Sequence, residues 1–170
     1  MTIMIGTGDY RYEYRPDWAK LPAGMEFQAP SAVAVDSHDN LYVFQRGDPP
    51  VLVFDRDGNM IAQWTRKDGV PADAHLVYVG PDDGVYLAGR DAHQILKYTA
   101  EGELVMSLGN RDRAKLQAPF NHPADMCVAP AGSPQAGDIF VADGYGNSRV
   151  HRFSASGNYI TSFGDPGSGP

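Results

Sequence analysis

One tyrosine in a tight turn invites a chemical explanation in this 170-residue sequence. Tyr145 lies in "DGYGNSRVHRF" (143–153), where glycine and asparagine favour a bend and an arginine and a histidine follow. A phenol can transfer a proton, but its unperturbed pKa is near 10, so it needs a nearby metal ion or cation to act as a base at neutral pH. The simpler interpretation is the bend of a β-hairpin, and the elements around the turn must decide between the two.

The turn belongs to the third of three similar units, which cover 31–64, 75–109 and 124–164. Large apolar residues and a turn glycine recur at equivalent positions: Tyr42, Tyr86 and Phe140; Phe54, Tyr98 and Phe153; Trp64, Leu108 and Phe163; Gly58, Gly102 and Gly157. Each unit contains four short strand patterns, in the first unit roughly 32–36, 41–44, 51–54 and 60–64. A repeated four-stranded unit of about 40–50 residues predicts an all-β fold, a β-propeller of three blades, rather than a generic β-sandwich.

The strand order inside a blade predicts where its loops meet. Neighbouring strands run antiparallel, so the start of the first strand lies beside the end of the second. Loops that enter a blade and loops that follow its second strand therefore share one rim. Besides Tyr145, this rim is expected to gather Arg46, His75, Arg90, Asp91, His93 and His122. His93 also belongs, with His151, to the repeated hairpin, where a structural role is the expected one.

Composition limits the kinds of partner. The net charge is −7, which argues against nucleic acid, because such a surface would be basic. Cys127 is the only cysteine, so no disulfide can form within the chain. The start of the sequence has no signal-peptide pattern, and no run of 18 apolar residues occurs, so we expect a soluble chain of unknown location.

The hairpin segments "AHQILKY" and "NSRVHRF" resemble the NHL repeat. More narrowly, "VFQRGD", "RDAHQILKY" and "VADGYGNSRVHRFSASG" are similar to peptidyl-α-hydroxyglycine α-amidating lyase and its bacterial relatives, over about residues 10–167. The resemblance implies six blades, of which this sequence holds three. We expect an N-terminal segment (1–28) and a single domain (29–170) whose blades span about 29–66, 73–110 and 122–165.

The resemblance also implies roles for individual residues. His75 matches a zinc ligand, Arg46 matches the arginine that holds a carboxylate or oxyanion, and Tyr145 matches the general base. The backbone carbonyls of Val77 and Val33 match positions around a structural calcium. The other zinc histidines of the family fall in later blades, so His122 is the candidate for a further ligand. Zinc is the preferred metal, and Arg90 and Asp91 are candidates for contacts with substrate.

Three blades alone would leave two apolar blade faces exposed. We therefore expect two chains to close one six-bladed ring as a C2 homodimer, the alternative being a fragment of a longer gene. The alternating tyrosines of "YRYEYR" (10–15) predict a strand that either crosses to the partner's third blade or caps a sheet edge.

The expected function is that of a metal-dependent enzyme with a site in the central channel. Its reaction would be lyase-like, or hydrolytic toward esters, lactones or phosphoesters, on a small or peptide-like substrate. The alternative is a non-catalytic NHL module that binds other macromolecules, because many functions share this fold.

Overall fold

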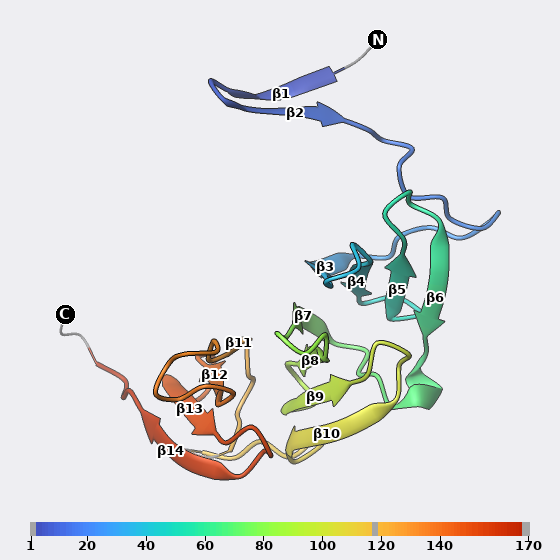
Figure 1. The fold of residues 1–170 in the computed structure, drawn as a ribbon. Helices are drawn as coiled ribbons and strands as arrows, with labels where there is room; N and C mark the ends of the chain where they lie inside the picture. The colour runs from blue at the N-terminus through green and yellow to red at the C-terminus, as the bar shows by residue number, and fades with distance from the viewer. Residues whose placement is uncertain (1–2, 117–118, 168–170) are drawn as a thin grey trace.

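The computed structural model describes residues 3–116 and 119–167 and confirms the predicted all-β propeller fold. Three four-stranded antiparallel sheets follow an arc, with β3, β7 and β11 innermost and β6, β10 and β14 outermost (Figure 1). A single 3-10 turn, η1 (Arg66–Asp68), is the only helical element in the described ranges. No helix in those ranges is long and apolar enough to cross a membrane.

The strands of each blade follow one another in sequence order from the centre outwards. The first blade contains β3 (Pro30–Val35), β4 (Leu41–Gln45), β5 (Val51–Phe54) and β6 (Met60–Trp64). The second contains β7 (Ala74–Val79), β8 (Val85–Gly89), β9 (Gln94–Tyr98) and β10 (Leu104–Gly109). The third contains β11 (Asp125–Val128), β12 (Ile139–Asp143), β13 (Arg149–Phe153) and β14 (Tyr159–Phe163).

The middle strands of the first two blades are apolar on both faces because the second blade lies between two others and the N-terminal segment packs on the outer side of the first. All four residues of β5 are buried, as are all five of β8. Large side chains of the first blade, including Tyr42 and Trp64, pack against Val77 and Leu87 of the second. Side chains on opposite faces of the second blade thus belong to two different cores, and the blade interfaces hold the arc together.

A repeated contact sets the spacing of the blades. The outer strands of the first two blades each place a large side chain over the turn glycine of the next blade. Trp64 covers Gly102, where an added Cβ would lie 2.7 Å from the indole Nε1. Leu108 covers Gly157 in the same way, with the nearest atom 3.0 Å from an added Cβ. Both glycines have a positive φ, so the turn and the close approach both require glycine.

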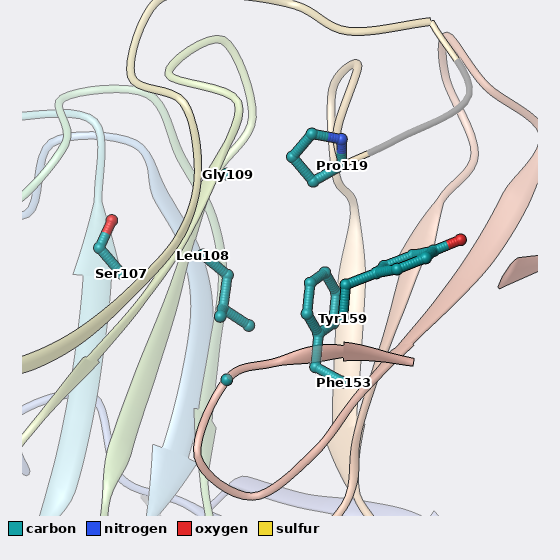
Figure 2. Close-up of a pocket in the computed structure, with 7 residues that line it drawn as sticks. Ser107, Leu108, Gly109, Pro119, Phe153 and Tyr159 are labelled. Carbon is teal, nitrogen blue, oxygen red and sulfur yellow. The ribbon is translucent and has the colours of Figure 1, made fainter. Parts of the chain in front are cut away.

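A shallow pocket of about 290 Å³ lies beside Leu108, between the second and third blades. Figure 2 shows the Leu108 side chain directed toward the ring of Phe153, with Pro119 and Tyr159 around them. None of the described residues that line this pocket carries a carboxylate, an imidazole or a cation, and the one phenol, on Tyr159, has none of these groups beside it in the lining. The pocket is therefore a packing gap between blades rather than a site for acid–base chemistry.

The predicted strand at 10–15 is confirmed as β2 (Tyr10–Tyr14), but it pairs with β1 (Ile3–Thr7), a strand that was not expected. This hairpin stands off from the first blade (Figure 1). The chain then returns along the open face of the first blade, where Trp18, Leu21 and Met25 pack over a core cluster of Val43, Leu52 and Phe54. The N-terminal segment thus covers part of one of the two open blade faces.

Candidate functional site

The structure brings His75 and Tyr145 into contact, although 70 residues separate them. Tyr145 lies in the turn after β12, and His75 is the second residue of β7. The imidazole Nε2 lies 3.1 Å from the phenol oxygen, and the rings meet edge to face. Tyr145 is 64% exposed, so its hydroxyl is open to a ligand while it contacts the imidazole. The phenol and the imidazole form one hydrogen-bonded unit that can pass a proton.

The first blade fixes the strand that carries His75. Ser31 donates its hydroxyl to the backbone carbonyl of His75 at 2.9 Å. Arg46, in the turn after β4, donates from Nε to the carbonyl of Ala74 at 3.3 Å. Across the described ranges, no carboxylate lies within salt-bridge distance of the Arg46 guanidinium. Arg46 therefore both supports the site and keeps its terminal nitrogens available for an anion.

A buried carboxylate anchors the turn that presents Tyr145. Asp143 is fully buried at the end of β12 and accepts hydrogen bonds from the Asn121 backbone, the Asn147 side chain and His151 Nε2. His151 is equally buried, which agrees with the structural role expected for it. These contacts hold the turn from both sides, so the phenol is presented by a rigid scaffold.

A charged pair lies on the other side of the tyrosine. Arg90 donates from Nε and Nη2 to the two carboxylate oxygens of Asp91 at 2.8 and 2.9 Å. Hydrogen bonds from Arg90 lower the pKa of Asp91, and the same pair raises the pKa of Arg90. The Arg90 guanidinium carbon lies 6.0 Å from the centre of the Tyr145 ring. A guanidinium cation thus lies beside the phenol ring.

His122 and His93 extend this row of contacts. His122 Nε2 lies 3.8 Å from Asp91, and the His122 backbone N–H donates to His93 Nδ1 at 3.1 Å. His93 is buried and has a φ of 55°, and Ser148 repeats this conformation just before the third strand of its own blade, with a φ of 54°. The conformation of His93 therefore belongs to the repeated turn, and its role is structural.

The described residues do not form a metal site by themselves. No group of three or more His, Cys, Asp or Glu side chains within 3–116 and 119–167 is arranged to hold an ion. His75 Nε2 contacts the phenol, and His122 contacts Asp91 and His93. Val33 and Val77 lie on the innermost strands of adjacent blades. Within the described ranges, the donor set is smaller than the three-histidine zinc site with an open position that the resemblance implies.

Sequence reasoning missed Ser31 and Asp143, the residues that position the site. Ser31 acts on the neighbouring blade, which no local pattern reveals. Asp143 comes directly before the glycine of "ADGYGN". An aspartate at the start of a turn often accepts hydrogen bonds within that turn, so this position could have been recognised from the sequence.

The fold defines an NHL-type β-propeller chain, and one rim of it carries a hydrogen-bonded histidine and tyrosine. No family model matches the chain. It is 28% identical over 193 residues to the peptidylglycine alpha-amidating monooxygenase of Rattus norvegicus, a match of 96% of this chain and 19% of the relative. It is 31% identical to human NHL repeat-containing protein 3, over 92% of this chain and 48% of the relative.

Two further comparisons agree with these. A probable peptidyl-alpha-hydroxyglycine alpha-amidating lyase of Caenorhabditis elegans is 45% identical over 71 residues, 41% of this chain and 19% of the relative. The solved virginiamycin B lyase of Staphylococcus aureus has a TM-score of 0.63 at 17% identity, over 82% of this chain and 42% of that chain. The resemblance to NHL propellers and amidating lyases is confirmed, and the chain spans less than half of each of these relatives.

Proposed function

We propose that the rim cleaves the N–Cα bond of a peptide-like substrate that ends in α-hydroxyglycine. The observation that carries the proposal is the 3.1 Å hydrogen bond between His75 and Tyr145, with Arg90 beside the Tyr145 ring and Arg46 hydrogen-bonded to the strand that carries His75. The name of the Caenorhabditis elegans relative gives its substrate as a peptidyl-α-hydroxyglycine, and the similarity of this chain to that relative supports the same reaction here.

The reaction needs one proton removed and one proton returned. The substrate hydroxyl gives its proton to the phenol oxygen of Tyr145 while the phenol proton passes to His75 Nε2. The hydroxyl oxygen then forms a carbonyl, the N–Cα bond breaks, and its electron pair stays on the amide nitrogen. That nitrogen takes a proton back from the Tyr145–His75 pair, which leaves a peptide amide and glyoxylate. Atoms and charge balance, and the pair returns to its starting state.

Arg46 is the proposed holder of the substrate carboxylate. Its terminal nitrogens are exposed and its Nε is anchored on the strand of His75, so a bound carboxylate would lie close to the imidazole. Arg90 has its charge matched by Asp91, which suits it to stabilise charge at Tyr145 rather than to bind a second anion.

Metal binding stays a proposal that rests on the resemblance. His75 would supply one zinc ligand, and the remaining ligands would come from outside the described residues. Zinc would supply Lewis acidity for the substrate, and calcium near Val33 and Val77 would stiffen the channel. No step described above depends on either ion.

The test is glyoxylate release from a small N-acyl-α-hydroxyglycine, measured as a hydrazone, with and without added zinc. We expect turnover by the chain as it stands and at least a 100-fold loss in the variant His75→Ala. Parallel assays with an aryl ester, a lactone and a phosphotriester test hydrolysis. Faster turnover of any of these would assign a hydrolase instead, and no turnover of any substrate would favour a binding module.

Zinc content of the same two proteins completes the test. Stoichiometric zinc in the wild type that is lost in His75→Ala supports the ligand role. Equal zinc in both proteins would contradict that role and leave His75 only as the partner of Tyr145.

A further inference from the structure

The N-terminal hairpin has an unpartnered aromatic face. Directly opposed residues of β1 and β2 share a face, which places the side chains of Ile3, Ile5, Tyr10, Tyr12 and Tyr14 together. Each of these side chains is more than half exposed. Neither strand pairs with a blade, so one edge of β2 has open backbone groups. An isolated two-stranded hairpin is marginal in water, so this hairpin needs a partner.

Its position in the repeat shows what kind of partner fits. Trp18 covers the turn glycine Gly58 of the first blade with its backbone carbonyl and one edge of its indole, in the place that the side chains of Trp64 and Leu108 take over Gly102 and Gly157. In the two complete interfaces, this contact comes from the outer strand of the preceding blade. The hairpin just before Trp18 therefore lies where the outer edge of a preceding blade belongs, on the side of the first blade away from the second (Figure 1).

The third blade has the matching open surface at the other end of the arc. Phe163 closes its outer strand, as Trp64 and Leu108 close theirs, and pairs with Val150 as they pair with Val51 and Ile95. Trp64 and Leu108 are 3% and 5% exposed, because a following blade covers them, whereas Phe163 is 55% exposed. The outer edge of β14 is also unpaired.

The inner strand of the first blade also has an apolar side chain that no neighbouring blade covers. Val33 is 61% exposed, whereas Val77, its equivalent in the second blade, is 3% exposed because the first blade covers it. The chain thus carries both halves of a blade interface, one at each end of its arc.

We propose that these surfaces bind a second copy of this chain, with β2 adding to the free edge of the partner's β14 as the outermost strand. The aromatic face of the hairpin and the ring of Phe163 would become buried, and so would Val33. Two copies related by a two-fold axis satisfy both contacts at once and close a ring of six blades. This inference does not depend on the reaction proposed above.

The experiment is size-exclusion chromatography with light scattering on the whole chain. We expect twice the chain mass of 18.4 kDa. Tyr12→Asp and Phe163→Asp change exposed residues, so each variant should fold, which circular dichroism can verify. We expect the dissociation constant of the dimer to rise at least about 30-fold in each variant. Leu116→Asp, at an exposed apolar residue outside both surfaces, is the matched control and should dimerise like the wild type.

A mixture of the two variants tests the pairing itself. In a mixed dimer, one interface carries both substitutions and the other carries neither, so mixing Tyr12→Asp with Phe163→Asp should restore a species of two chains. A monodisperse wild-type monomer would overturn the proposal. So would a wild-type dimer that neither substitution weakens, or a mixture that stays monomeric.

Discussion

The interface between the first two blades gives the sharpest stability prediction, for the variant Trp64→Ala. Trp64 is 3% exposed and its ring centre lies 5.7 Å from that of Tyr42 and 5.3 Å from that of Tyr98. Burial of an indole removes on the order of 200 Å² from water, about 5 kcal/mol at about 25 cal/mol per Å². Alanine retains a small part of this, so we expect the free energy of unfolding to fall by about 3–5 kcal/mol.

A second variant separates packing from polarity. Within the described part of the chain, the buried Trp64 Nε1 has no hydrogen-bond partner. Trp64→Phe keeps an aromatic ring and removes this unsatisfied N–H, so it should cost only about 1–2 kcal/mol.

Urea unfolding followed by circular dichroism measures both variants, because it does not depend on the fluorescence of the residue that is removed. A loss below about 1 kcal/mol for Trp64→Ala would refute the view that blade contacts carry the stability of the arc. A loss for phenylalanine equal to that for alanine would refute the packing argument.

Three further predictions concern turns and charges. Gly102→Ala should destabilise more than Gly132→Ala in thermal unfolding, because both have a positive φ but only Gly102 lies under Trp64; equal losses would exclude the clash. Burial opposes ionisation of Asp36, but hydrogen bonds from Asn40, His38 and Tyr42 outweigh it and lower the pKa of Asp36. Its stabilisation is therefore present above about pH 4 and lost as the pH falls below that value, so the difference in unfolding free energy between wild type and Asp36→Asn should shrink in acid; a constant difference would contradict this. Asp91→Asn leaves Arg90 without its carboxylate, so KM for the anionic substrate should fall in steady-state kinetics, and a rise in KM would contradict the assigned pairing.

The blades could be predicted well from the sequence because their strands and turns are determined by residues that are close together in the chain. Alternating apolar residues and turn glycines recur in register, and the strands of the first blade begin and end within two residues of the predicted bounds. The N-terminal hairpin was harder to predict, because β1 contains three apolar residues before a glycine but no pattern that identifies its partner strand. Only the structure shows that Trp18 covers the turn glycine of the first blade, as Trp64 covers that of the second.

The sequence was enough to predict which residues share one rim, but not which of them contact one another. Antiparallel strand order was enough to place His75, Tyr145 and Arg90 on one rim. Their hydrogen bonds depend on the angle between blades, which arises from packing at interfaces far from the rim. The same packing decides that His122 contacts Asp91 and His93, and no sequence pattern could have given that choice.

The most direct test of the account is the ratio of kcat/KM for glyoxylate release between wild type and Tyr145→Phe. The phenylalanine keeps the ring and removes only the hydroxyl that contacts His75. We predict a loss of about 100- to 10,000-fold, the usual contribution of a positioned acid–base group, and no loss for the control Tyr159→Phe on the outer strand of the third blade. Unchanged turnover by Tyr145→Phe would contradict the assignment of the proton transfer to this pair.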